Sequence, residues 1–370
     1  MQIGGRTESI MNGNYDYSTH TSAHGNEPDY YAMYTQEKTA EARNVFSRYN
    51  LALFLFTVIA YAVIIVAEVF IILFLGRDGA LRFFDNVYVE WIFGVGPMYL
   101  IAFPIFVLLI KGMKTAKREK KKMSAGEFLS LLLIGEGLMF VGNIIGQTLN
   151  SFIGAILGRE VTNSTSELID NSPIWLIFLV TVILAPIIEE LMFRKFMIDR
   201  FSRYGDLLAV IVSSVAFGLF HGNFYQFFYA TMLGFILGYI YTRTRNVKYS
   251  ILMHMIINFF GSVAVMPLLD IISNLGVMMS ILETGGQIDF SAFIQNTFII
   301  ASYYVIQFAI YIAGIVTLIF YITHRLFKFE NKYDYKLQRE RTAGVILLNV
   351  GTILFLAASL VLFGISIFMG

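Results

Sequence analysis

The chain contains no cysteine among its 370 residues. A disulfide framework, a thiolate nucleophile and a cysteine-bound metal are therefore excluded. Charged residues are also scarce, because they make up 14% of the chain against about 25% in a typical soluble domain. The formal net charge is only +1, so the chain lacks the strong cationic field that is typical of nucleic-acid-binding proteins. Nucleic acid is not expected as a partner.

Apolar side chains are what the chain has in excess. They make up 57% of its residues, and the mean hydropathy is +0.67, a balance that predicts a protein solvated by lipid. A membrane-spanning helix needs about 20 mostly apolar residues. Nine stretches meet that requirement: 51–76, 88–110, 126–150, 174–198, 206–222, 227–242, 249–270, 297–323 and 345–369. We therefore predict an all-α, polytopic integral membrane helix bundle of about 8–9 transmembrane helices, of which the fifth and sixth are short.

Basic residues predict the orientation of this bundle, because lysine and arginine are retained on the cytoplasmic side of membranes. Nine spans that alternate from a cytosolic N-terminus place 24 of the 27 Lys and Arg residues on the cytoplasmic side. Only Arg77, Arg82 and Arg159 then fall outside. We expect an integral protein of a bacterial plasma membrane, with the N-terminus in the cytosol and the C-terminus outside.

Composition divides the chain into four parts. Residues 1–45 are rich in Tyr, Asn, Ser, Thr and Gly and contain no apolar signal-peptide core, which predicts a disordered cytosolic tail. Residues 46–170 carry about three spans and a solvated basic loop at 111–122, which we expect to lie on anionic lipid headgroups. Residues 171–270 form a core of about four spans, and residues 271–370 add about two.

The fourth span carries ionisable residues at membrane depth, where such groups usually face a bundle interior or a water-filled cavity. Glu189 and Glu190 are adjacent, and Arg194 follows. Glu190 and Arg194 are four residues apart and share a helix face, which favours an ion pair. Glu189 lies about 100° around the helix and is free to face elsewhere. Pro186 removes a backbone hydrogen bond in the preceding turn, so we expect a kink that admits water to the carboxylates.

Two later spans carry histidines at membrane depth. His221 ends the fifth span, and His254 lies in the seventh, four residues before Asn258 and on the same helix face. On straight helices the depths of Glu189, His221 and His254 differ by more than one site allows. Either the fifth helix begins in the cytosol and tilts, or its boundary differs from the prediction. So many polar residues on three nearby helices still favour a functional site over isolated packing contacts.

These residue types support two kinds of hydrolytic chemistry. A glutamate near a histidine can take a proton from water and make it a nucleophile, while a histidine with an asparagine can donate hydrogen bonds to the oxyanion of an attacked carbonyl. Alternatively, Glu189, His221 and His254 could hold a zinc ion with an open position for water. The chain has no His-Glu-x-x-His helix, so a zincin-type site is excluded. Peptide-bond hydrolysis within the membrane is the simplest hypothesis.

Small residues form two stripes at helical spacing beside these polar residues. Their members are Ser214, Gly218 and Gly222 in the fifth span, and Ala230, Gly234 and Gly238 in the sixth. Such stripes let two membrane helices approach closely. We expect the fifth and sixth helices to pack tightly beside the site.

The order of the polar residues resembles the CAAX protease and bacteriocin-processing family of intramembrane proteases, which includes the prenyl-protein CAAX endopeptidase. The family pattern is Glu-Glu-x-x-x-Arg, then Phe-x-x-x-His, then His-x-x-x-Asn or Asp, on successive membrane helices. This chain supplies, in that order, Glu189, Glu190, Arg194, Phe217, His221, His254 and Asn258. The resemblance covers about residues 174–262, and the flanking spans are predicted from hydropathy alone.

The resemblance implies an endopeptidase in which Glu189 and His221 activate water. His254 and Asn258 would hold the oxyanion, and the second glutamate and the arginine of the motif would support them. The family is described both as metalloproteases and as glutamate-dependent enzymes that need no metal, so the zinc question stays open. The partners implied are a hydrophobic or lipid-modified peptide or protein substrate and the membrane lipids.

Two other functions are alternatives at this point. A non-catalytic immunity or scaffold protein of the same fold would bind a peptide or partner, and an ion-coupled transporter would use the glutamates as carriers. The complete motif argues against a decayed site. The absence of an internal repeat in the sequence argues against a duplicated transporter.

Overall fold

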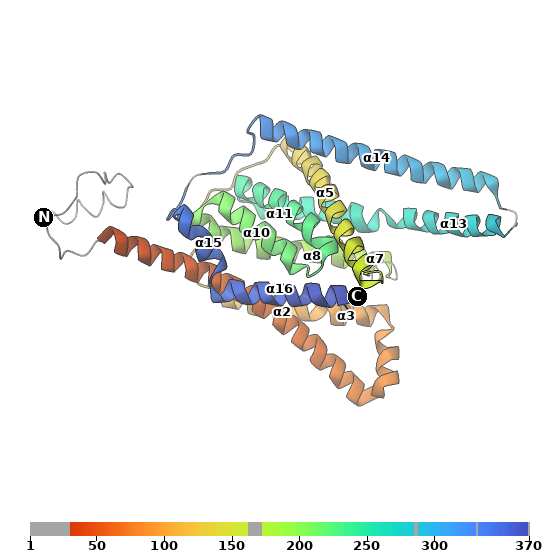
Figure 1. Cartoon of the computed structure of the whole chain (residues 1–370), viewed down its shortest axis with the longest axis horizontal. Coiled ribbons are helices and arrows are strands. Elements are labelled where there is room, and N and C mark those ends of the chain that lie inside the picture. The colour runs from red at the N-terminus through yellow and green to blue at the C-terminus, as the bar shows by residue number, and fades with distance from the viewer. Residues whose placement is uncertain (1–29, 162–171, 285–287, 331, 369–370) are drawn as a thin grey trace.

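The structure is a computed structural model that describes residues 30–161, 172–284, 288–330 and 332–368. Within these ranges every regular element is a helix, and no strand occurs. The predicted all-α bundle is confirmed (Figure 1). The first part of the predicted tail, residues 1–29, lies outside the described residues.

The N-terminal region runs outward along one long helix and returns through shorter ones. α2 spans Tyr30–Phe84 and changes course at Gly76, whose φ of 71° is a conformation that glycine adopts without strain. After it come α3 (Val87–Gly96), η2 (Pro97–Ala102) and α4 (Phe103–Ile110). In Figure 1 the chain descends along α2, turns at the lower edge of the molecule and returns to α3.

Residues 30–45 belong to α2, so the prediction of a disordered tail as far as residue 45 is wrong for this part. Ala42 is fully buried. Glu41 accepts from the guanidinium of Arg203, with 2.9 Å between Oε1 and Nη2. Arg203 is distant in sequence from this segment, so the composition of residues 30–45 does not reveal that such contacts hold it in a helix.

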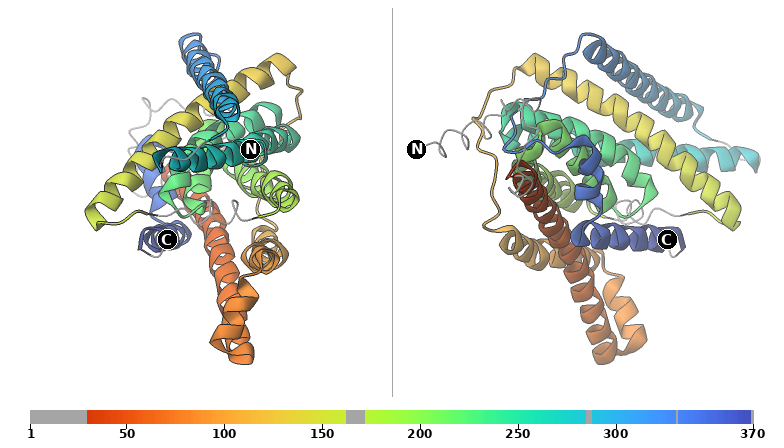
Figure 2. Two further views of the ribbon diagram at one scale, coloured as in Figure 1. Left: turned by 90° about the vertical axis from the view of Figure 1, so that its right-hand side faces the viewer. Right: turned by 60° about the vertical axis from the view of Figure 1, so that its left-hand side comes forward.

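The middle of the bundle consists of α5 (Ala125–Leu157), α10 (Asp206–Phe220) and α11 (Phe224–Thr244). α11 packs against both of the others (Figures 1 and 2). The predicted close approach of the small-residue stripes is confirmed. A Cβ atom added to Gly234 would lie 3.0 Å from Cα of Ser214, and one added to Gly218 would overlap Thr231.

The C-terminal part continues the bundle. It contains α12 (Val247–Asn258), η6 (Phe259–Val263), α13 (Met266–Glu283), α14 (Phe290–Thr323), α15 (Arg339–Leu347) and α16 (Val350–Phe368). The last predicted span, 345–369, is broken between α15 and α16. Asn349 stands at the break, where Oδ1 accepts from the N–H of Thr352 at 2.9 Å and Nδ2 donates to Val345 O at 3.0 Å. Its side chain therefore ends one helix and begins the next.

Seven helices of the described chain are long and apolar enough to cross a membrane. They are Ala32–Phe84, Val87–Ile110, Ala125–Leu157, Ile174–Tyr204, Val247–Glu283, Phe290–Thr323 and Val350–Phe368. The polytopic membrane bundle is therefore confirmed. Two of the nine predicted stretches, α10 and α11, form helices but are not among these seven. α10 has only 15 residues, and the Tyr, Thr and Gln residues of α11 lower its hydropathy.

The basic segment at 111–122 is held against the bundle and is not a free loop. The N–H of Ala116 donates to Asp199 O at 2.6 Å, and that of Lys121 donates to Thr244 O at 2.7 Å. Residues 111–124 thus form an extended strap, which we call the first strap, across helix ends, with most of its lysines exposed.

A second strap, residues 324–330 and 332–338, lies at the same end of the bundle. The N–H of Asp334 donates to Arg203 O at 2.8 Å, and Arg118 of the first strap donates to Lys332 O at 2.8 Å. The two straps and the helix ends near Asp199, Arg203 and Thr244 therefore meet in space. The predicted topology assigns all of these segments to the cytoplasmic side of the membrane. Which side of the membrane this end faces stays a prediction.

Candidate active site

The fourth predicted span is continuous but irregular. It consists of α7 (Ile174–Ile177), η3 (Phe178–Leu184), α8 (Ala185–Glu189), η4 (Glu190–Ile198), α9 (Asp199–Phe201) and η5 (Ser202–Tyr204). η3 and η4 are π-helical, and such widened turns often occur at functional sites. Glu189 ends α8 and Glu190 begins η4, so the two carboxylates lie where the helix changes its register.

Pro186 accounts for the first irregularity. The N–H of Ala185 reaches back five residues to Val180 O, which is the π-helical register. In that register Thr181 O would face the nitrogen of Pro186, which carries no hydrogen. The side chain of Asn258 supplies the missing donor, with Nδ2 2.8 Å from Thr181 O. The disruption expected at Pro186 thus takes the form of a π-helical segment that is completed by a side chain of α12.

Glu190 is the buried centre of the polar cluster. It has no exposed surface, and neither does Arg194. Arg194 Nε lies 3.3 Å from Glu190 Oε2, so the predicted ion pair is confirmed. Glu190 Oε1 lies 3.1 Å from His254 Nδ1. The guanidinium of Arg194 also lies over the ring of Phe217, 4.3 Å from its centroid, which stabilises the buried cation further.

Glu189 faces the same imidazole from the other side. Its Oε2 lies 3.7 Å from His254 Nε2, and 18% of its side chain is exposed, whereas the side chain of Glu190 is fully buried. An ionised Glu190 can only accept, so the contact at Nδ1 places a proton on that nitrogen. The second nitrogen of His254 is thereby directed toward Glu189.

His221 joins the cluster through Phe217. Its Nδ1 lies 2.8 Å from Phe217 O, and because a carbonyl oxygen can only accept, Nδ1 carries the hydrogen and donates this hydrogen bond. The Phe217 ring makes edge contacts with the rings of both His221 and His254, with centroids 4.8 and 5.8 Å away. His221 is also close enough to interact electrostatically with Glu189, although no hydrogen bond or ion pair joins these two described residues. The difference in depth expected from straight helices does not separate His221 from the site.

Asn258 lies one turn beyond His254 on α12 and is already hydrogen-bonded. One of its two amide hydrogens binds Thr181 O, which leaves the second as a donor. Ser262 donates to Asn258 O at 2.6 Å, and its hydroxyl lies 3.3 Å from that of Thr181. These contacts tie α12 and η6 to η3 and fix the orientation of the amide.

Several residues near the site were not predicted from the sequence. Tyr99 of η2 and Tyr229 of α11 both lie near Glu189. Ser250 is fully buried and adjoins Glu190. The tyrosines come from the second and sixth predicted spans, where no spacing relative to the glutamates can reveal them. Ser250 lies four residues before His254 on one helix face, a signal that was available in the sequence.

The residues proposed for zinc do not form a metal site in this arrangement. Across the described ranges, no group of three or more His, Asp or Glu side chains is placed to hold a metal ion. His254 Nδ1 is engaged by Glu190 and His221 Nδ1 by Phe217 O. Both contacts leave Nε2 open and are also typical of metal-bound histidines, so they do not decide the question; the spacing of Glu189, His221 and His254 in the described chain does not form a metal site, and no catalytic step is assigned to a metal.

Comparison with known proteins finds one family model that matches the segment containing these residues. Residues 171–260 match the family model described as Type II CAAX prenyl endopeptidase Rce1-like. The predicted family resemblance is confirmed. The matching segment contains all six predicted site residues. No solved structure matches the chain.

Three curated bacterial proteins are similar to this chain. The "Putative membrane peptidase YdiL" of Bacillus subtilis (strain 168) is 29% identical over 163 residues, which cover 43% of this chain and 66% of that protein. Two proteins of Lactococcus lactis subsp. lactis (strain IL1403) also match. "UPF0177 protein YbdI" is 29% identical over 40% of this chain and 84% of its own length, and "UPF0177 protein YxdF" is 31% identical over 30% and 63%. The chain thus spans just under two thirds of the length of the Bacillus protein.

Proposed function

We propose that this protein is a membrane-embedded endopeptidase that hydrolyses a peptide bond with water activated by a glutamate. The observation that carries the proposal is the position of His254 between two carboxylates, buried Glu190 at Nδ1 and partly exposed Glu189 at Nε2. This arrangement lies inside the segment that matches the Rce1-like family. The similarity to a protein described as a membrane peptidase supports the same activity.

Water is the nucleophile in the proposed reaction. It attacks the carbonyl carbon of the scissile bond while its proton passes to Glu189, which is the exposed member of the glutamate pair. His221 Nε2 accepts a second hydrogen bond from the same water, because Nδ1 of that ring is committed to Phe217 O. The carbon–nitrogen bond then breaks, and the proton held by Glu189 passes to the leaving amine.

The oxyanion that forms on the attacked carbonyl needs hydrogen-bond donors. We assign this role to Nε2–H of protonated His254 and to the second amide hydrogen of Asn258. Glu190 fixes the His254 ring, and Glu189 and Glu190 together supply the two negative charges that a doubly protonated imidazole and the Arg194 guanidinium require. Arg194 balances Glu190, so Glu190 and Arg194 are positioning residues and do not touch the substrate.

A hydrophobic or lipid-modified peptide or protein is the substrate class that we propose. The site residues belong to helices within the apolar bundle, so a polar substrate would have to leave water to reach them. We place cleavage near the cytosolic side of the membrane, in line with the predicted topology.

Purified full-length protein in lipid nanodiscs provides the test. A library of quenched hydrophobic and prenylated peptides would be cleaved by the wild type, and Glu189→Gln and His221→Ala would each reduce turnover strongly. Glu136→Gln is a matched control, since Glu136 is a half-buried glutamate of α5 that lies near Tyr303 and Tyr311 of α14. Equal turnover by the wild type and both site variants would overturn the proposed site.

A further inference from the structure

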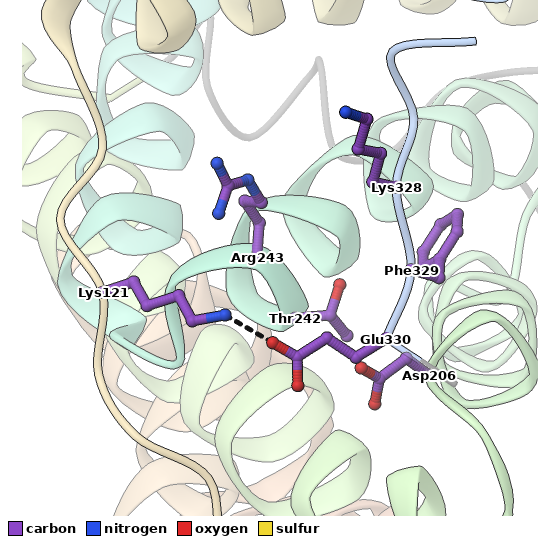
Figure 3. A pocket seen from close by; sticks show the side chains of 7 residues that line it. All are labelled: Lys121, Asp206, Thr242, Arg243, Lys328, Phe329 and Glu330. Carbon is purple, nitrogen blue, oxygen red and sulfur yellow. Dashed lines mark hydrogen bonds and ion pairs between the residues drawn. The ribbon is translucent and has the colours of Figure 1, made fainter. Parts of the chain in front are cut away.

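The two straps enclose a polar cavity at the end of the bundle. It has two adjacent parts, of about 230 and about 490 Å³, which share Lys121, Thr242 and Glu330 in their walls. Figure 3 shows the smaller part, with Lys121 of the first strap directed toward Glu330 of the second. The larger part is within the size range of small-molecule sites. This cavity lies outside the cluster around Glu189.

Cations dominate the lining of this cavity. Seven basic side chains line it against three acidic ones. Two of the acids are already paired, Asp206 with Arg245 at 2.5 Å and Glu330 with Lys121. Neither Lys117 nor Lys328 makes an ion pair in the described part of the chain, and both are exposed residues of the cavity lining. The cavity therefore carries positive charge that its own acids do not neutralise.

Arg245 forms a rigid cationic part of the wall. It is 94% buried and donates to Ser202 Oγ at 3.1 Å as well as to Asp206, while its Nε has no hydrogen-bond partner among the described residues. Its φ is 53°, at the C-cap of α11, where glycine is the residue without strain. The contacts with Ser202 and Asp206 fix the guanidinium in the wall of the cavity.

We propose that this cavity binds a phosphate group, such as a phosphomonoester or a diphosphate. Several Lys and Arg side chains that converge on one cavity match the charge and the multiple acceptor oxygens of such a group. The phosphate has two chemical sources, the headgroup of an anionic lipid and a soluble phosphate compound. Glu330 competes with the ligand for Lys121, so it opposes binding.

Isothermal titration with inorganic pyrophosphate tests the proposal on the full-length protein in phosphatidylcholine nanodiscs. We expect saturable binding that weakens with added salt. Lys117→Gln/Lys328→Gln should raise the dissociation constant at least about tenfold, as for a lost charge-assisted contact. Glu330→Gln should lower the dissociation constant, which a loss of folding cannot mimic. The matched control, Lys114→Gln/Lys122→Gln, removes the same charge from the first strap outside the cavity lining.

Nanodiscs that also contain phosphatidic acid distinguish the two sources. If a lipid headgroup fills the cavity, these nanodiscs weaken pyrophosphate binding to the wild type; if a soluble phosphate is the ligand, they leave it unchanged. If the Lys117→Gln/Lys328→Gln and Lys114→Gln/Lys122→Gln variants weakened pyrophosphate binding equally, general electrostatic attraction would account for the effect, and the proposal would be overturned. The absence of saturable pyrophosphate binding to the wild type would overturn it as well.

Discussion

His254 is held through opposite ring nitrogens by two adjacent carboxylates of one helix. Nδ1 lies 3.1 Å from Glu190 Oε1 and Nε2 lies 3.7 Å from Glu189 Oε2. The two glutamates therefore lie in different environments: Glu190 is fully buried and balanced by Arg194, whereas Glu189 is partly exposed. This difference leads to separate predictions for the two glutamates.

Replacing Glu189 by Gln should impair catalysis without destabilising the fold. Loss of a general base typically reduces the rate by about 10²–10⁴-fold. The side chain is partly exposed, and its ion pair with His254 is long, at 3.7 Å, so we expect the thermal midpoint to change little. Single-turnover cleavage and thermal unfolding of the same preparation measure both effects. A variant that unfolds at a much lower temperature would instead assign Glu189 a structural role.

Replacing Glu190 by Gln should destabilise the protein, because it leaves the fully buried Arg194 without a counter-charge. Breaking a buried ion pair from one side typically costs about 3–5 kcal/mol. Glu190→Gln/Arg194→Met removes both charges and should recover much of that loss. Thermal unfolding of the two single variants and the double variant forms the required cycle. Additive losses in the double variant would contradict this account.

Asn258 should be coupled to Pro186 through the carbonyl of Thr181. Asn258→Ala leaves that part-buried carbonyl without its side-chain donor, at a typical cost of about 1–3 kcal/mol. Pro186→Ala restores a backbone N–H that can reach Thr181 in the π-helical register. We therefore expect Asn258→Ala to cost less stability in the Pro186→Ala background than in the wild type, as measured by a double-mutant unfolding cycle. An equal cost in both backgrounds would show that the two residues act independently.

The contact between α5 and α14 should not tolerate a side chain at Gly314. A Cβ atom there would overlap Leu133 O and lie 3.0 Å from Gly137 Cα. Overpacking of this kind typically costs about 1–3 kcal/mol, and here backbone would have to move. Gly314→Ala should lower the thermal midpoint in nanodiscs. Gly344→Ala is the matched control, because no other side chain or backbone of the described residues lies within 4 Å of its Cβ position.

The contact between the straps should make stability depend on pH. The hydrogen bond from Lys121 holds the pKa of Glu330 below its ordinary value of 4.5. The contribution of ionised Glu330 is therefore fully present above pH 4.5 and is lost as the pH falls through the lowered pKa of the folded state. The difference in thermal midpoint between the wild type and Glu330→Gln should shrink over that acidic range. Glu340→Gln, at an exposed residue of α15, should show no such change.

Removal of metal is expected to leave activity intact, since the proposed reaction uses only side chains of the chain. Purified protein would be treated with phenanthroline, its metal content measured, and peptide cleavage compared with the untreated sample. Activity that disappears with the metal and returns with added zinc would require the side chains of Glu189, His221 and His254 to rearrange.

Much of the architecture follows from the sequence alone. Apolar stretches of spanning length predict helices because every backbone polar group in lipid must be satisfied within its own segment. The ion pair of Glu190 and Arg194 was also predictable, because a spacing of four residues fixes the relative position of two side chains on any helix. For the same reason His254 and Asn258 could be assigned to one face of α12. Local helical geometry carries all of these predictions.

Only the tertiary structure decided how these faces meet. That His254 inserts between the two glutamates, and that Asn258 completes the backbone at Pro186, depends on the packing of α12 against α8 and η3, which no spacing within one helix encodes. The order of residues 30–45 likewise depends on distant partners such as Arg203. The strap cavity joins residues from the first strap, α11 and the second strap. Sequence periodicity determines which residues share a helix face, whereas long-range packing determines which faces share a site.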